Sequence, residues 1–123
     1  MKTVSRISDS ASEHDPDLRA SAPLPDLPSR AVLDNAGDLL RALAAPVRIA
    51  IVLQLREDAR CVHELVDALA VPQPLVSQHL RILKAAGVVE GERSGREVLY
   101  RLADHHLAEI VIAAVTHAAE DMP

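Results

Sequence analysis

The stretch that most constrains the fold runs from residue 62 to residue 102, where two short apolar helices are followed at once by a hairpin signature. The spacing of apolar residues predicts helices over about 62–69 and 74–86, with a tight break at Ala70-Val71-Pro72 and Gly87 ending the second helix. Two helices joined by so few residues indicate a helix-turn-helix.

Two runs rich in β-branched residues, about 88–92 and 97–102, flank Ser94-Gly95. This pattern predicts a β-hairpin with glycine at its turn. A hairpin placed directly after a helix-turn-helix predicts the wing of a winged helix-turn-helix domain. We therefore expect an α+β fold that is mainly α-helical with a β-hairpin wing.

Three further helices are expected, over about 31–44, 46–57 and 104–120. The chain has one Tyr and neither Phe nor Trp, so its core must be built from Leu, Val, Ile and Ala, which favours helices. The helix over 46–57 is apolar on most sides and should be the most buried. Residues 1–29 are rich in Ser, Asp and Pro and are expected to form a flexible arm, which leaves residues 30–123 as the folded domain.

Any nucleic-acid contact must come from a local surface, because the formal net charge of the chain is −5. The near absence of aromatic side chains also argues against single-stranded nucleic acid. One local surface qualifies, since residues 73–86 include Arg81 and Lys84 and no acid. Gln and Ser near the start of a helix can hydrogen-bond base edges, and nearby basic groups can neutralise phosphates. Double-stranded DNA is therefore the expected partner, contacted by Gln73, Ser77, Gln78, Arg81, Lys84, Arg93 and Arg96.

The last expected helix carries two pairs of metal-capable side chains, Asp104 with His106 and His117 with Glu120. At about 1.5 Å per residue the pairs lie roughly 20 Å apart, too far for one ion with ligand bonds of about 2 Å. In two antiparallel copies, the first pair of one chain meets the second pair of the other, and two-fold symmetry gives two identical four-ligand sites. A helix–helix seam is also indicated by the spacing of His106, Ile110, Ala113, His117 and Glu120.

Two imidazoles and two carboxylates suit Zn²⁺, with Co²⁺ as a substitute. Soft ions would need several thiolates, and Cys61 is the only cysteine. The simpler alternative is that Asp104 only caps the helix, the two histidines are half-buried at the seam, and Glu120 is solvated.

The runs LRALAAPVRIAIVLQL and CVHELVDALAVPQPLVSQHLRILKAAGVVEGERSGREVLYRL resemble the ArsR/SmtB family of metal-sensing repressors over about residues 33–120. The pattern Asp104-x-His106…His117-x-x-Glu120 is similar to the family's zinc site between C-terminal helices. The resemblance implies an obligate homodimer that binds an operator palindrome when metal-free and releases it when zinc favours a low-affinity conformation. One departure is that Pro72 and Gln73 stand where the family often has a Ser or Thr N-cap.

Cys61 lies where some family members place a ligand of a second metal site shared with the N-terminal arm. The candidate ligands here are Cys61, His63, Glu64 and His14, and the alternative is a small half-buried residue at a helix start. The run His63–Asp67 also resembles the HExxH protease motif, but it lacks the second histidine and no third ligand follows. We therefore expect no enzymatic activity.

One cysteine permits no internal disulfide, no apolar run reaches the length of a membrane span, and no signal peptide is evident. These features predict a cytoplasmic protein without a membrane partner. Two functional alternatives stay open. One is a winged-helix regulator that answers a redox or small-molecule signal through Cys61, and the other is a metal-binding dimer that does not bind DNA.

Overall fold

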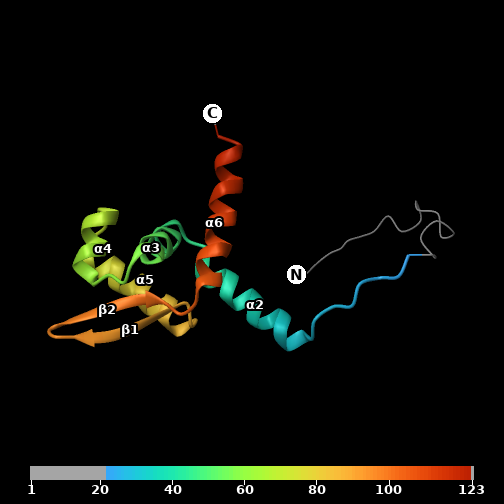
Figure 1. Ribbon diagram of the computed structural model, residues 1–123, viewed down its shortest axis with the longest axis horizontal. Coiled ribbons are helices and arrows are strands. Elements are labelled where there is room, and N and C mark those ends of the chain that lie inside the picture. Colours follow the sequence, from blue (N-terminus) through green and yellow to red (C-terminus); the bar gives the residue numbers. More distant parts are fainter. Residues whose placement is uncertain (1–21, 123) are drawn as a thin grey trace.

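The structure is a computed structural model that describes residues 22–122. Its elements follow the order α2 (Arg30–Leu43), α3 (Pro46–Glu57), α4 (Val62–Leu69), α5 (Gln73–Ala85), β1 (Val89–Ser94), β2 (Glu97–Leu102) and α6 (His105–Glu120). Helices α4 and α5 form the helix-turn-helix, and the antiparallel strands β1 and β2 form the wing (Figure 1). The predicted winged helix-turn-helix fold is confirmed.

Helix α3 lies at the centre of the domain, where it contacts α2, α4, α5, α6 and β2. Its residues Ile51 and Val52 have no exposed surface, which agrees with the sequence prediction for this helix. The buried core around it is entirely aliphatic, as the lack of aromatic residues required. Its other members are Leu43, Leu55, Leu65, Val76, Leu80, Leu83, Val88, Val89, Leu107 and Val111.

The turn between α4 and α5 uses a left-handed alanine. Ala70 has φ 55° and ψ 42°, and its N–H donates to the carbonyl oxygen of Val66 at 2.9 Å. Glycine is the usual residue in this conformation because it has no Cβ. Ala70 therefore ends α4 at a steric cost, and the chain turns at once into α5.

Helix α5 begins without a side-chain cap, as the Pro72-Gln73 departure suggested. The carbonyl oxygen of Pro72 instead accepts the N–H groups of Leu75 and Val76, at 3.0 and 3.1 Å. Pro74 has no N–H to satisfy. Without a Ser or Thr cap, the N–H of the exposed Gln73 is therefore the main donor at the start of α5 that has no partner inside the helix.

The wing is a two-residue hairpin whose turn lies one position later than expected. Ser94 pairs with Glu97, so the turn is Gly95-Arg96 rather than Ser94-Gly95, and Gly95 has φ +64°. The positive φ at Gly95 is what the turn demands of glycine. The position of Arg96 at the wing tip follows directly.

A backbone bridge joins the segment before α4 to the wing. The Arg60 N–H donates to the Tyr100 carbonyl oxygen at 3.0 Å, and the Tyr100 N–H donates to the Arg60 carbonyl oxygen at 2.8 Å. The bridge holds the start of α4 against β2.

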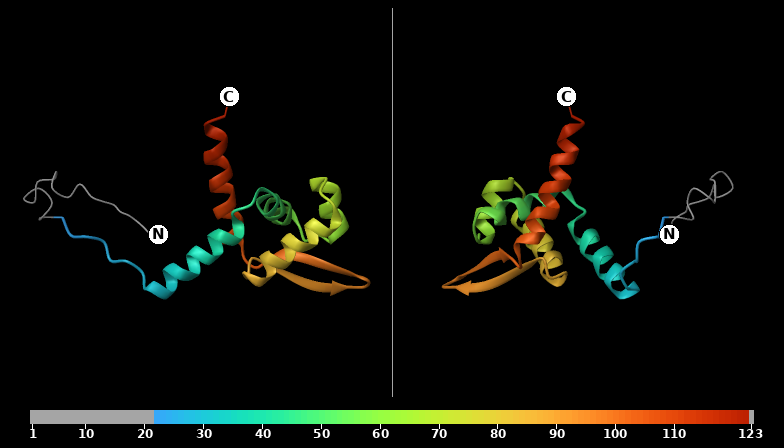
Figure 2. Two further views of the ribbon diagram at one scale, coloured as in Figure 1. Left: turned by 180° about the vertical axis from the view of Figure 1, so that it is seen from behind. Right: turned by 45° about the vertical axis from the view of Figure 1, so that its right-hand side comes forward.

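Helices α2 and α6 extend away from this body and diverge from each other in every view (Figures 1 and 2). Helix α6 is buried only near its start, at Leu107, Ala108 and Val111, and its residues from 113 onward are exposed. The open surfaces of the two helices carry apolar side chains, among them Val32, Leu33, Leu40 and Val115.

Residues 22–29 are exposed and contain neither helix nor strand, and α2 begins at Arg30 on the N-cap Ser29, whose Oγ accepts the Val32 N–H at 3.2 Å. The rest of the expected arm, including His14, lies outside the described residues. The division into arm and domain therefore stays a prediction. Within residues 22–122, no helix is both long and apolar enough to cross a membrane.

Candidate DNA interface and metal centres

Helix α5 has one buried face and one open face, as its sequence pattern predicts. Val76, Leu80 and Leu83 are buried in the core. Opposite and beside this buried face lie the expected DNA-contacting side chains, of which Ser77 is half-buried and the others are exposed: Gln73, Gln78, Arg81 and Lys84. A polar face at the second helix of a helix-turn-helix is the surface that such proteins lay in the major groove.

The wing adds exposed Arg93 and Arg96 beside its turn. Within the part of the chain described, neither of them forms an ion pair, and the same holds for Arg81 and Lys84. Arg101 differs, because it is paired with Glu92 across the hairpin. Among the described residues, the exposed basic side chains without an ion pair therefore gather on α5 and the wing tip, although the chain as a whole is acidic.

The first pair of expected zinc ligands lies at the start of α6. Asp104 is the N-cap, and its Oδ1 accepts the His106 N–H at 2.9 Å. The same oxygen lies 3.4 Å from His106 Nδ1, and both side chains are more than half exposed. The capping alternative for Asp104 is thus confirmed, while its second oxygen remains available for a cation.

The second pair lies in the last turns of α6. His117 Nδ1 is 3.8 Å from Glu120 Oε1, and these side chains are also exposed. Each pair is therefore brought together, but the two pairs stay at opposite ends of the helix. Among residues 22–122, no cluster of three or more ligands includes any of the four. One chain alone does not assemble this site.

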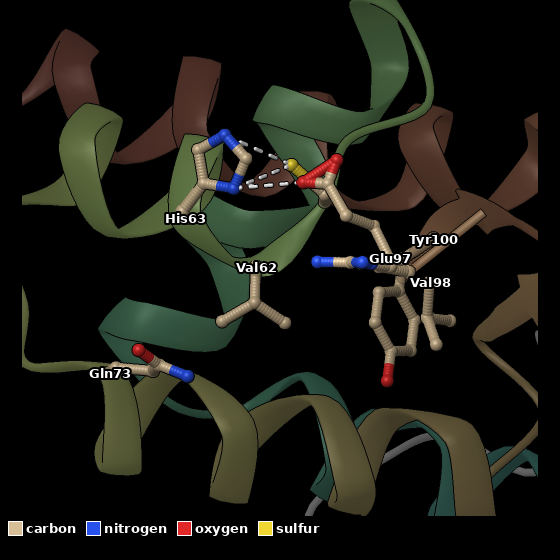
Figure 3. A pocket seen from close by; sticks show the side chains of 8 residues that line it. Val62, His63, Gln73, Glu97, Val98 and Tyr100 are labelled. Carbon is tan, nitrogen blue, oxygen red and sulfur yellow. Dashed lines mark hydrogen bonds and ion pairs between the residues drawn. The ribbon is translucent and has the colours of Figure 1, made fainter. Parts of the chain in front are cut away.

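A different ligand cluster forms where α4 meets β2. Cys61, His63 and Glu97 each offer one ligand atom, and these atoms all lie within 4.8 Å of one another (Figure 3). Cys61 Sγ is 3.2 Å from His63 Nδ1, which in turn is 3.1 Å from Glu97 Oε1. The structure thus brings together Cys61 and His63 of the expected second site and adds Glu97.

Glu64 of that expected set plays another part. Its Oε1 accepts the Cys61 N–H at 2.9 Å as part of a capping box at the start of α4, and it also accepts the Cys61 thiol at 3.3 Å. The bond from the Cys61 N–H lowers the pKa of Glu64, whereas burial raises the pKa of the Cys61 thiol. Cys61 lies at a helix start, as the simpler alternative proposed, but it is buried rather than half-buried, and it also faces the cluster.

Sequence reasoning missed Glu97. Its position in the expected second strand gave no sign that it would face Cys61, because the Arg60–Tyr100 bridge that aligns the two segments is a long-range contact. A carboxylate next to the arginine of a hairpin tip is ordinarily a solvated charge. Only the folded chain reveals the juxtaposition.

The helix-turn-helix, its open polar face and the basic wing define a winged helix-turn-helix protein of the regulatory type. Comparison with known proteins is consistent with this class. Residues 45–91 match the family described as bacterial regulatory protein, arsR family. The chain is also 76% identical over 110 residues to the HTH-type transcriptional repressor SmtB of Mycobacterium tuberculosis, spanning 89% of this chain and 82% of that protein. The chain belongs to the ArsR family, whose members regulate transcription and are not enzymes.

Solved structures agree with this assignment. A homodimeric winged helix-turn-helix DNA-binding domain from Mycobacterium bovis superposes with a TM-score of 0.68 at 27% identity, over 81% of this chain and 94% of that one. The transcriptional repressor BigR from Xylella fastidiosa superposes with a TM-score of 0.63 at 32% identity, over 72% of this chain and 95% of that one. The family expected from the sequence is confirmed.

Proposed function

We propose that this protein is a zinc-responsive transcriptional repressor that binds operator DNA as a metal-free homodimer. Zn²⁺ binds between the α6 helices of the two chains, with Co²⁺ as a working substitute, and releases the DNA. Because it acts on DNA, the protein works in the cytoplasm. Its high identity to a repressor named SmtB supports the regulatory role.

The observation that carries the proposal is the arrangement of ligands on α6. Asp104 with His106 and His117 with Glu120 form two exposed pairs at opposite ends of one helix. An antiparallel partner helix brings the first pair of each chain to the second pair of the other. Two nitrogen and two oxygen ligands then suit a four-coordinate Zn²⁺.

The open face of α6 fits such a partner. The seam residues His106, Ala113 and His117 are exposed and Ile110 is half-buried, on a side of α6 away from the buried Leu107 and Val111. Alanine in the seam allows two helix backbones to approach closely. The exposed apolar residues of α2 form a further unpaired surface, which a second copy of the chain would also cover.

The DNA-binding half of the proposal depends on α5 and the wing. Gln73, Ser77 and Gln78 are positioned to hydrogen-bond base edges from the major groove, and Arg81 to reach a guanine or a phosphate. Lys84, Arg93 and Arg96 would neutralise phosphates. In a dimer the two α5 helices must match successive major grooves, about 34 Å apart.

Zinc and DNA are then linked through the dimer frame. An ion that fixes one terminal helix against the other changes the spacing of the two α5 helices, so it favours a dimer that fits the operator poorly. Coupling of this kind is reciprocal, and operator DNA must weaken zinc binding by the same factor by which zinc weakens DNA binding.

The test is a titration of duplex DNA from upstream of the coding sequence, followed by fluorescence anisotropy with and without Zn²⁺. We expect zinc to weaken DNA binding by the wild-type protein by about 5- to 150-fold, the usual range of such coupling. The double variant His106→Ala, His117→Ala should bind the DNA equally well with and without the metal.

The matched control is His105→Ala, because His105 is an exposed imidazole of the same helical turn outside the ligand set. This variant should keep the zinc response. A double variant that still releases DNA on zinc addition would contradict the α6 assignment, and a wild-type protein that never binds the duplex would contradict the repressor role.

A further inference from the structure

The start of α4 and the strand β2 meet in a shallow pocket outside the α6 sites. The Arg60–Tyr100 bridge fixes the backbones of the two segments, and the pocket is lined by Cys61, His63, Gln73, Arg96 and Glu97 among others. Figure 3 shows the imidazole, the thiol sulfur and the Glu97 carboxylate converging on one point. The described residues contain no other cluster of three such ligands.

We propose that Cys61, His63 and Glu97 form a second metal site in each chain, which takes Zn²⁺ or Co²⁺ and joins the wing to the helix-turn-helix. All three ligands come from one chain, so the site does not require a partner subunit. It differs in this respect from the α6 sites, and it uses the wing carboxylate in place of any residue from the N-terminal arm.

The spacing of the ligand atoms supports this assignment. Bonds of about 2.3 Å to sulfur and about 2.0–2.2 Å to nitrogen and oxygen place neighbouring ligands of a tetrahedral ion roughly 3.3–3.7 Å apart. The observed separations are 3.2 Å from Cys61 Sγ to His63 Nδ1 and 3.1 Å from that nitrogen to Glu97 Oε1. Because Cys61 Sγ is also 3.5 Å from His63 Nε2, the sulfur lies over the imidazole ring, and the ring must turn to direct Nδ1 at an entering ion.

The surroundings support the ligands. Cys61 is buried and held at the helix start by the Glu64 carboxylate, whereas His63 and Glu97 are exposed, with side chains 68% and 48% exposed. The imidazole and the carboxylate can therefore adjust, and the pocket leaves the fourth position to water. One thiolate, one imidazole and one carboxylate suit a borderline ion such as Zn²⁺. Metal binding releases the thiol proton to solvent.

The location gives the site a consequence that depends on the proposed DNA-binding function. Glu97 follows Arg96 at the wing tip, and Gln73 at the start of α5 lines the same pocket. A metal held here fixes the wing relative to the start of α4, beside the first turn of α5. It would therefore set the angle between the two surfaces that contact DNA.

Titration of the full-length protein with Co²⁺, followed by absorption spectroscopy, separates this site from those on α6. Cys61 is the only cysteine in the chain, and the α6 ligands contain no sulfur. A sulfur-to-cobalt charge-transfer band therefore reports this site alone, while the visible d–d bands report both. We expect the band to appear, to account for one of the two Co²⁺ ions that each chain binds in total, and to be absent from Cys61→Ser.

The variant Glu97→Gln should weaken the affinity that the charge-transfer band reports by at least about tenfold, since even outer-sphere partners contribute that much. His63→Gln should do the same. Glu90→Gln is the matched control, because it removes an exposed carboxylate from the other strand of the same hairpin and should leave the band unchanged.

A wild-type protein without the charge-transfer band would overturn the proposal, even if d–d bands showed the α6 sites to be filled. If Glu97→Gln and Glu90→Gln gave the same Co²⁺ affinity by the charge-transfer band, Glu97 would not be a ligand and the link to the wing would be overturned. The charge-transfer band could behave as expected in the wild-type protein and in every variant while zinc leaves DNA binding unchanged. That result would support this site and contradict the proposed zinc switch.

Discussion

Asp104 combines two roles that a single substitution can separate. Its Oδ1 accepts the His106 N–H and caps α6, and the carboxylate charge is what a zinc site would use. Asparagine caps a helix about as well as aspartate, but it lacks the charge. The capping role and the metal role therefore predict different behaviour for Asp104→Asn.

We expect Asp104→Asn to change the free energy of unfolding of the metal-free protein by less than about 0.5 kcal/mol, while zinc binds more weakly. Asp104→Ala should weaken zinc binding as well and also destabilise the protein by about 1 kcal/mol. Calorimetry of zinc binding and denaturant unfolding check both. Unchanged zinc affinity in Asp104→Asn would leave the residue as a cap alone.

Ala70 offers a prediction about stability. Its φ of 55° places an L side chain in the left-handed region at the end of α4, where glycine avoids the steric cost. Part of the stability gained by removing this steric cost is offset, because glycine makes the unfolded chain more flexible. Ala70→Gly should therefore stabilise the protein by about 0.5–1 kcal/mol, measured by denaturant unfolding, and a loss of stability would show that the turn is not strained.

At the scale of elements, α6 has a packed first half and a projecting second half. Val111 is 2% exposed in the core, whereas Val115, one turn later, is 37% exposed on the projecting half. Both positions lie on the same face of the helix, because they are four residues apart. The first holds the helix to the domain, and the second adds to the exposed apolar surface of the projecting half. The same substitution at the two positions should therefore act on different equilibria.

Val111→Ala should lower the free energy of unfolding by about 2 kcal/mol, because two buried methyl groups are lost and a cavity remains. Val115→Ala should cost less, and its cost should depend on protein concentration as the dimer dissociates. Unfolding at several concentrations measures both. Equal, concentration-independent losses would count against a partner surface on the projecting half of α6.

The wing and α5 should differ in how they bind DNA. Replacing Arg93 or Arg96 by Ala removes a phosphate contact, so binding should weaken on all sequences. The slope of the logarithm of affinity against the logarithm of salt concentration should become shallower by about one for each arginine removed. Gln78→Ala should instead alter the preference among operator sequences. Anisotropy over a range of salt concentrations tests this, and a sequence-specific effect of the wing arginines would contradict it.

Elements governed by local pattern were predictable from the sequence. Helical periodicity predicted all five described helices, and the glycine at position 95 predicted the hairpin, although its turn lies one residue later than expected. The α6 pairs were also predictable, because their separation depends on one helix alone. Glu97 and Arg60 were not, since their placement depends on long-range pairing between segments that no local spacing encodes.

At the scale of the whole molecule, the central claim is that zinc is shared between two chains. Mixing two defective variants tests it. In a dimer of one His106→Ala chain and one His117→Ala chain, one of the two symmetric sites loses both imidazoles and the other keeps all four ligands. Each variant alone forms dimers in which both sites lack a histidine.

The most direct measurement is high-affinity zinc binding by the two variants, separately and after co-refolding as a mixture, in a Cys61→Ser background that removes the thiol site. We expect weak binding by each variant alone and the recovery of one tight site in each mixed dimer, and mixed dimers should form about half of the mixture. Tight binding by either variant alone, or a mixture no better than its components, would contradict a zinc site shared between the two α6 helices.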